Sequence, residues 1–471
     1  MPQTLKKADP TKPNPLGTEK ISKLLLRFSL PSIIAMLVSS LYNIVDQIFI
    51  GQGLGYLGNG ATTVAFPLST FCLAITLLLG VGAASCYSLR LGEGDRKTAA
   101  YCIGSSLSFS LLAGLAILIL GELFLPWLLP VFGATSENIG LAIEYSRIIL
   151  IGFPVLIIEN VISQVCRADG SPNFSMAFMV AGAIVNCILD PLFIFVFKWG
   201  MSGAAWATVI GQFVSLAIAL FYLPRFKQVK LTRDDFKIRW PVLGKCCELG
   251  LSSALNQAAV LAVQITVNNL FKHYGALSIY GSNIPISASG VAFKLNGLYV
   301  SLMVGLSQGL QPIVGFNYGA GKYERVKKCM KLAMVSMVIL GCMVEAIFQL
   351  FPEQLLSLFG AGDDLYIRFG VLMLRVYFAC IGIQGIVQLS STYFAAIGQP
   401  PKGIFLSLSR SIIYFMPLVF LFSSLWGIDG QICAQPIADF LAVITSLILD
   451  TKSFKKMNEL ERVHKLAPET F

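Results

Sequence analysis

Long apolar runs dominate this chain and recur from near its beginning to near its end. Each is about 20 residues or longer, the length of helix that crosses a lipid bilayer, and short polar connections separate them. A backbone in lipid must satisfy its hydrogen bonds internally, which leaves only helices or closed barrels. The sequence therefore predicts an all-α integral membrane protein of twelve transmembrane helices: 28–50, 61–89, 100–121, 142–166, 174–197, 203–224, 249–271, 284–314, 329–350, 367–396, 403–425 and 430–451.

The composition agrees with this class and excludes several others. Hydrophobic residues make up 55% of the 471 residues and charged residues only 13%, against about 25% in soluble domains. The net charge of +10 lies in short connections rather than in a basic domain with interleaved aromatic residues, so we expect no nucleic-acid partner. Eleven cysteines without a CxxC pair, and only two histidines, argue against disulfides, haem, zinc and histidine-based catalysis. We expect neither a cofactor nor an enzyme.

Positive charge predicts the orientation, because the cytoplasmic loops of membrane proteins carry an excess of Lys and Arg. These residues gather in alternate connections, and the loops between them carry Glu and Asp instead. Residues 1–23 lack the pattern of a cleavable signal peptide and are expected to form a disordered polar arm. We predict a multi-pass protein of the cell membrane with both termini in the cytoplasm.

The second half of the chain repeats the first. Gly-Glu-Gly-Asp-Arg-Lys (92–97) matches Gly-Ala-Gly-Lys-Tyr-Glu-Arg (319–325) 227 residues later, and the segment 190–192 matches 416–418. Each half holds six spans, so both halves enter the membrane in the same direction and form parallel repeats, an arrangement found in transporters. The predicted division is a cytoplasmic arm (1–23), an N-lobe (24–224), a cytoplasmic linker (225–245), a C-lobe (246–451) and a cytoplasmic tail (452–471).

Two carboxylates lie inside the apolar runs of the first half. Asp46 is in the first run and Asp190 in the fifth, and an ionised carboxylate at bilayer depth costs roughly 2.5–3.5 kcal/mol on insertion scales. Asn186, four residues before Asp190, shares its helix face, and Thr208 on the next helix adds a hydroxyl. This grouping indicates a site for a transported cation. Hydrogen bonding between helices is the structural alternative.

The repeat favours the first explanation. Asp190 aligns with Met416, so the buried carboxylate cluster is expected only in the first half, whereas a requirement of the architecture would be expected in both. Glu159 is a third acidic candidate: it either attracts a cationic substrate or pairs with a cation such as Lys294. Three arginines lie nearer to span ends, where their side chains are expected to snorkel to the interface: Arg147, Arg375 and Arg410.

Other polar or adaptable side chains at bilayer depth are candidates for a substrate cavity, with core packing as the alternative for each. The second half is expected to supply a polar, uncharged lining from Gln257, Gln264, Asn268, Asn296, Gln308, Gln311, Gln384 and Gln388. The residues singled out as candidates for contact with the substrate are Asn43, Glu159, Gln164, Gln257, Lys294, Tyr299 and Met303. The run 51–55 has neither the preceding strand nor the following Lys-Ser/Thr of a phosphate loop, so we expect no ATP.

Several segments together resemble the multidrug and toxic compound extrusion (MATE) family over about 20–451. They are LYNIVDQIFIGQGLG in the first span, the GEGDRK and GAGKYER loops, RADGSPNF and AAIGQPPK after spans four and ten, and NCILDPLFIF followed by GMSGAAWAT. Each motif alone is loose, but their order, spacing and duplication are specific. The resemblance implies two six-helix lobes around a central cavity that opens alternately to either side of the membrane.

The resemblance also implies a function. It would be the export of organic, mostly cationic and amphipathic compounds in exchange for H⁺ or Na⁺, without ATP. The coupling residues of one prokaryotic branch match Asp46, Asn186, Asp190 and Thr208, and a transported Na⁺ would be held by the first three. Another branch uses acidic residues in spans seven and ten, where this chain has Gln257 and Gln384 or Gln388. A lipid-linked precursor flippase of the same superfamily is the alternative, and a channel is a more distant one.

Overall fold

The computed structural model describes residues 14–132, 134, 138–281, 283–357 and 364–466, and its regular structure over these residues is entirely helical. The α-helices are α1 (Ile21–Gly92), α2 (Arg96–Val131), α3 (Ile139–Ala168), α4 (Pro172–Pro191), α5 (Gly200–Leu220), α6 (Trp240–Ala276), α7 (Asn283–Gly319), α8 (Tyr323–Leu350), α9 (Pro352–Ser357), α10 (Asp364–Leu372), α11 (Ile381–Ala396), α12 (Pro400–Leu408) and α13 (Met416–Leu466). π-Helical turns follow α4, α10 and α12, at Leu192–Val196, Met373–Tyr377 and Ser409–Phe415.

Two of the longest helical stretches each carry two spans. The Gln47 side chain donates to Thr62 Oγ1 at 3.2 Å, although 15 residues of straight helix would separate them by about 22 Å. The chain therefore reverses within α1, between the spans Ile21–Leu54 and Gly60–Gly92. In the same way, the hydroxyls of Tyr414 and Thr445 lie 2.8 Å apart.

The second reversal lies at Gly427, whose φ of 61° and ψ of −135° no helix contains. Among the described residues, ten helices are long and apolar enough to cross a membrane, and the bent pair Asp364–Tyr377 with Ile381–Ala396 makes an eleventh. Counting the stretch Pro400–Arg462 as two spans, because of the break at Gly427, gives twelve. The predicted number of transmembrane helices is therefore confirmed.

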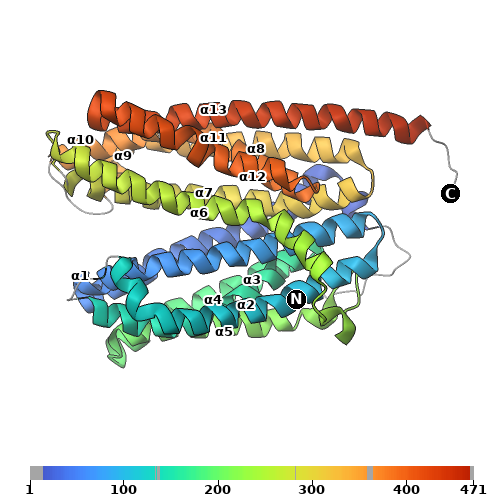
Figure 1. Cartoon of the computed structure of the whole chain (residues 1–471), viewed down its shortest axis with the longest axis horizontal. Coiled ribbons are helices and arrows are strands. Elements are labelled where there is room, and N and C mark those ends of the chain that lie inside the picture. Colours follow the sequence, from blue (N-terminus) through green and yellow to red (C-terminus); the bar gives the residue numbers. More distant parts are fainter. Residues whose placement is uncertain (1–13, 133, 135–137, 282, 358–363, 467–471) are drawn as a thin grey trace.

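The internal repeat is visible in the backbone. Three pairs of glycines with positive φ lie 227 or 228 residues apart, each pair at the same kind of turn in the two halves: Gly94 and Gly321, Gly170 and Gly398, Gly200 and Gly427. A side chain disfavours this left-handed conformation, so glycine is required at both members of a pair. Figure 1 shows the result as two bundles side by side, which we call the N-lobe (α1–α5) and the C-lobe (α6–α13).

The outer surface and the interior are both apolar. Most buried apolar side chains form one core that runs through both lobes, and a small second cluster lies in the C-lobe. Large apolar side chains also face outward on many helices, with Ile119 64%, Ile188 61% and Ile339 56% exposed. A soluble monomer rarely exposes contiguous apolar surface on this scale, whereas a multi-pass membrane protein presents such side chains to lipid.

The two lobes touch through glycines that let backbones meet. A Cβ on Gly82 would lie 2.0 Å from the Cys246 carbonyl oxygen, and one on Gly250 would lie 1.9 Å from that of Leu78. The other close pairs join the end of α1 to the end of α7 and the start of α1 to α7: Gly92 with Phe316, Gly319 with Leu89, and Gly309 with Ser29. All of these contacts lie at one end of the molecule. At this end α1 and α6 begin, and both α7 and the second span of α1 finish. We call this the closed end.

The residues before α1 and after the last span are ordered where they are described. Arg325 on α8 donates to the Leu16 and Glu19 carbonyls at 3.1 and 2.6 Å, so the expected disordered arm is wrong for residues 14–23; residues 1–13 lie outside the described part. Residues 452–466 of the expected tail continue α13 as helix, and Lys327 on α8 donates to Asn458 in this segment at 2.5 Å; residues 467–471 lie outside the described part. Both contacts reinforce the C-lobe near the closed end.

The segment between the lobes packs on the N-lobe. Asp169, in the turn between α3 and α4, accepts four hydrogen bonds: from the hydroxyls of Tyr87 and Tyr222 at 2.6 and 2.7 Å, and from the backbone N–H groups of Lys227 and Gln228 at 2.6 and 3.1 Å. Burial raises the pKa of the Asp169 carboxyl group, although the four hydrogen-bond donors act in the opposite direction. One carboxyl group thus joins α1, the turn that follows α5 and the linker.

Candidate functional site

The structure brings the four predicted coupling residues into one buried group. Asp46 lies on α1 and Asp190 near the end of α4, with 7% and 0% of their surface exposed. The Asn186 amide donates to Asp190 Oδ1 at 3.4 Å and to Thr208 Oγ1, on α5, at 3.3 Å. The carboxyl group of Asp46 lies close enough to that of Asp190 to act on it electrostatically.

No cationic side chain balances this carboxyl pair within the described residues. Neither aspartate forms an ion pair with a described Lys or Arg. Three buried oxygens of the group have no hydrogen-bond partner: Asp46 Oδ1, Asp190 Oδ2 and Asn186 Oδ1. Two adjacent carboxylates in a buried site cannot both stay ionised without a compensating charge. The arrangement therefore suits a proton or a hard cation that prefers oxygen ligands.

Local sequence explains how Asp190 is presented. Pro191 ends α4, because proline has no backbone N–H to donate the next hydrogen bond of the helix. The next residues, Leu192–Val196, form a π-helical turn, an irregularity that frequently marks functional sites. The C-lobe has a π-helical turn at Ser409–Phe415, just before Met416 and Pro417. The distortion recurs in both halves, whereas the aspartate is present only in the first.

The other site candidates of the N-lobe make contacts that do not include this carboxyl pair. Asn43 is exposed and donates to the Ser39 carbonyl of its own helix at 2.7 Å. Gln164 is buried against α1, with its Cγ 3.1 Å from where a Cβ on Gly80 would lie. Glu159 is also buried, and the cation that acts on it is Arg167.

The expected pairing of Glu159 with Lys294 is wrong. Lys294 is exposed on α7, in the other lobe, and has no ion pair within the described residues. Arg167 is instead 98% buried, and it donates to the hydroxyls of Ser163 and Ser175 at 2.9 and 2.7 Å. The polarity of a side chain did not reveal which face of its helix meets the bundle.

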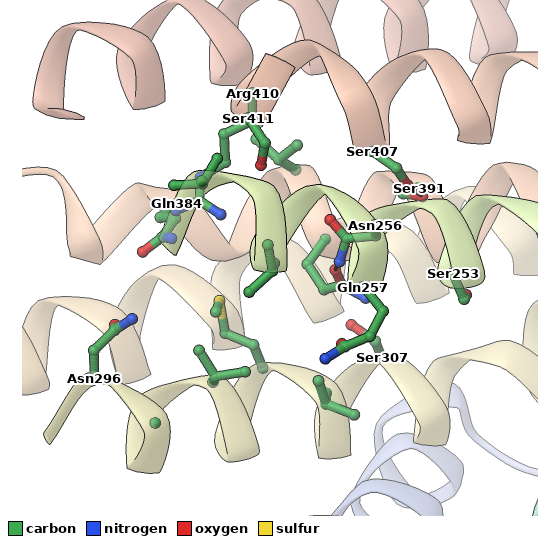
Figure 2. A pocket seen from close by; sticks show the side chains of 18 of the residues that line it. Ser253, Asn256, Gln257, Asn296, Ser307, Gln384, Ser391, Ser407, Arg410 and Ser411 are labelled. Carbon is green, nitrogen blue, oxygen red and sulfur yellow. Dashed lines mark hydrogen bonds between the residues drawn. The ribbon is translucent and has the colours of Figure 1, made fainter. Parts of the chain in front are cut away.

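A cavity of about 480 Å³ lies in the C-lobe and reaches the N-lobe. Its wall combines apolar side chains, among them Phe66, Val260 and Met303, with seven uncharged amides that the sequence analysis named: Gln257, Gln264, Asn296, Gln308, Gln311, Gln384 and Gln388. Figure 2 shows three of these amides, Gln257, Asn296 and Gln384, on different helices around the cavity. Asn268 and Lys294 are not part of the lining, and Tyr299 is buried behind it, with its hydroxyl against Gly341 and Gly385.

One ion pair borders this cavity, and sequence reasoning missed it. Arg410 lines the cavity and donates from Nε to Asp439 Oδ1 at 2.7 Å, while Gln435 donates to the same oxygen at 3.0 Å. The expectation that Arg410 snorkels is wrong, and Asp439 is a buried carboxylate of the second half that the sequence analysis did not name. Gln435 and Asp439 are four residues apart, the same amide–carboxylate spacing as Asn186 and Asp190, and that signal was available.

We expect Arg410→Met to lower the free energy of unfolding by about 1–3 kcal/mol, because Asp439 then stays buried without its charged donor. Thermal unfolding of the purified protein in detergent measures the change. Arg375→Met is the matched control, since Arg375 is exposed in a neighbouring π-helical turn. A variant at Arg410 as stable as the control would show that the ion pair contributes little.

Comparison with known sequences follows the same division into halves. A sequence model of the MatE family matches residues 31–192 and 253–421, one segment in each lobe. The multidrug export protein MepA of Staphylococcus aureus strain MSSA476 is 26% identical over 435 residues, which cover 91% of this chain and 93% of that protein. MepA of Staphylococcus saprophyticus is 24% identical over 434 residues, with the same coverage.

Solved structures agree with the sequence comparison. A transporter of the MOP superfamily from Pyrococcus furiosus, described as having a binding pocket of reverse polarity that suggests a different function, superposes with a TM-score of 0.88, 26% identity and coverage of 94% of this chain and 98% of that one. An outward-facing multidrug resistance MATE transporter superposes with a TM-score of 0.88, 25% identity and the same coverage. Because the two family matches span well over half of the sequence, the chain belongs to the MatE family.

Proposed function

We propose that this protein exports organic, mostly cationic and amphipathic compounds across the cell membrane in exchange for H⁺ or Na⁺. The observation that carries the proposal is the buried pair of Asp46 and Asp190, which forms no ion pair with a described Lys or Arg and leaves two carboxylate oxygens without hydrogen-bond partners. Relatives named as multidrug export proteins support the same direction of transport.

Coupling follows from the charge of this pair. A proton or Na⁺ that binds between Asp46 and Asp190 neutralises one of two buried negative charges and so lowers the cost of burying them, and its release restores that cost. Such binding drives a change of state only if the two states differ in affinity for the ion. α1 carries Asp46 and also makes most of the glycine contacts at the closed end. Ion binding at Asp46 can therefore act through α1 on the contact between the lobes.

The structure fits an outward-open state in this scheme. Positively charged connections support a cytoplasmic position for the closed end; they include Arg96 and Lys97 after α1 and Lys322 after α7. Similarity to an outward-facing transporter supports this assignment. In that state the pair takes up the ion from outside while the substrate leaves.

The C-lobe cavity suits an amphipathic substrate. Its apolar and amide walls match a compound with an apolar body and a few polar groups. A lipid-linked diphosphate would instead require several unpaired cations, and the described lining has one, Arg410, which is already bound to Asp439. The observation therefore favours drug export over the flippase alternative.

Flux measurements in proteoliposomes test the proposal. Efflux of a fluorescent organic cation should accelerate when a pH gradient or a Na⁺ gradient is imposed, each in separate vesicles, and the active gradient identifies the coupling ion. Dye flux that responds to neither gradient would contradict antiport. Translocation of a labelled lipid diphosphate without dye flux would favour the flippase.

A further inference from the structure

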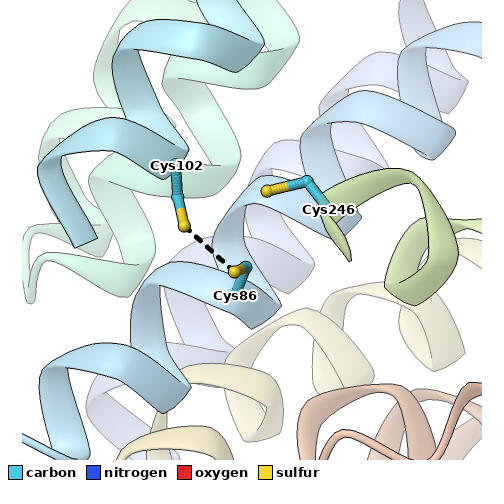
Figure 3. Close-up of side chains that lie close together, drawn as sticks. All are labelled: Cys86, Cys102 and Cys246. Carbon is cyan, nitrogen blue, oxygen red and sulfur yellow. Dashed lines mark hydrogen bonds between the residues drawn. The ribbon is translucent and has the colours of Figure 1, made fainter. Parts of the chain in front are cut away.

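Three cysteines from separate helices meet at the closed end. Cys86 lies in the second span of α1, Cys102 on α2 and Cys246 on α6, and Figure 3 shows their side chains pointing toward one another. All three Sγ atoms lie within 4.8 Å of one another, and those of Cys86 and Cys102 are 3.0 Å apart. The three residues are 99–100% buried. Because each cysteine comes from a different helix, the cluster has no CxxC spacing by which the sequence could have predicted it.

The spacing matches the ligand shell of a small thiophilic ion. With metal–sulfur distances near 2.3 Å, three thiolates around one ion lie about 4 Å apart, so the cluster needs only a slight widening between Cys86 and Cys102. Thiolates prefer soft ions such as Cu(I), together with Zn(II) and its heavier relatives. We propose that Cys86, Cys102 and Cys246 form a three-thiolate site for a soft d¹⁰ metal ion.

Charge is balanced by proton release and by neighbouring cations. Binding converts three S–H groups and one aqueous ion into a metal trithiolate, and three protons leave to solvent. No electron is transferred, so no oxidant is required. Arg90 and Lys245 act electrostatically on Cys86 and offset part of the negative charge of the bound form.

The site bridges the two lobes. Cys86 and Cys102 belong to the N-lobe, whereas Cys246 belongs to the C-lobe, and the Cys246 carbonyl is the group that Gly82 approaches. The complete ligand set therefore exists only while the closed end is closed. A ligand that binds one state better shifts the equilibrium toward that state, so the metal holds the lobes together at this end. This consequence, unlike the site itself, rests on the proposed function.

Binding is tested first on the purified full chain in detergent with a phosphine reductant. Cd(II) titration should give one ion per chain, with thiolate-to-cadmium absorption in the ultraviolet. Cys246→Ser should weaken binding by more than about tenfold, since even outer-shell changes at metal sites cost about 10–100-fold. Cys247→Ser is the matched control, because Cys247 is adjacent and lies outside the cluster. Equal affinity of the two variants would overturn the site.

The unmutated protein provides a second measurement, which does not depend on the folding of a variant. Cd(II) should slow alkylation of Cys86, Cys102 and Cys246, followed by mass spectrometry, and leave Cys247 unchanged. Alkylation that Cd(II) slows equally at all four cysteines, or at none, would refute the assignment.

Transport then separates the two proposals. In proteoliposomes, Cd(II) should inhibit dye efflux by the wild type and not by Cys246→Ser, whose efflux without metal stays at the wild-type level. Cysteine-dependent binding of Cd(II) without any dye flux would leave the metal site standing and remove the proposed function. Gradient-driven efflux that Cd(II) inhibits equally in both proteins would support the proposed function and contradict the metal site.

Discussion

Asp190→Asn is expected to uncouple transport from the ion gradient while leaving the fold intact. An amide has nearly the shape of the carboxyl group, and its oxygen can still accept the hydrogen bond from Asn186 that Asp190 Oδ1 accepts. It cannot take up and release a proton, and it supplies no charge to balance Na⁺. Coupling free energies between sites are typically 1–3 kcal/mol, so gradient-stimulated efflux should fall about 5- to 150-fold.

Dye efflux under the active gradient measures this loss. Asp46→Asn should cause a loss of the same order, because the two carboxyl groups act on one ion. Asp364→Asn is the matched control, since Asp364 is an exposed carboxylate at the start of α10 in the other lobe. If Asp190→Asn keeps full gradient-dependent efflux, the pair is a structural contact and not the coupling site.

The sequence predicted this pair for a physical reason. Residues four apart share a helix face, so Asn186 and Asp190 must point the same way. A short connection of the kind that joins α4 and α5 makes consecutive helices neighbours, which brings Thr208 to Asn186. Apolar length and repetition were equally direct evidence for twelve spans, because lipid leaves few other solutions.

Other features depend on long-range packing that no local pattern encodes. Lys294 lies on a helix with polar residues on several faces, and only the packing of α7 showed that its side chain is exposed and does not line the cavity. Arg410 meets Asp439 because the chain reverses at Gly427 and brings residues 29 apart into contact. Cys86, Cys102 and Cys246 meet only when both lobes are assembled. A helix face is set by its neighbours, and these neighbours are distant in sequence.

The second large effect is expected at the lobe contact, where Gly250→Ala should open the closed end. The new Cβ would lie 1.9 Å from the Leu78 carbonyl oxygen, and the backbone of α1 cannot rotate away as a flexible side chain could. Overpacking typically costs 1–3 kcal/mol, and 1.4 kcal/mol is tenfold in an equilibrium. The ratio of molecules with a closed end to molecules with an open end should therefore fall by about tenfold.

Alkylation of Cys246 by a water-soluble maleimide, without metal, reports this opening, because Cys246 is 0% exposed while the lobes touch. Gly244→Ala on the same helix is the matched control, since its Cβ would meet nothing within 4 Å. Both variants gain roughly 1 kcal/mol of helix propensity, so the comparison isolates the contact. If Gly250 served only core packing, its replacement would lower the unfolding temperature and leave labelling of the folded protein unchanged. Faster labelling of Gly250→Ala alone identifies the glycine contact as the element that distinguishes two states of the lobes.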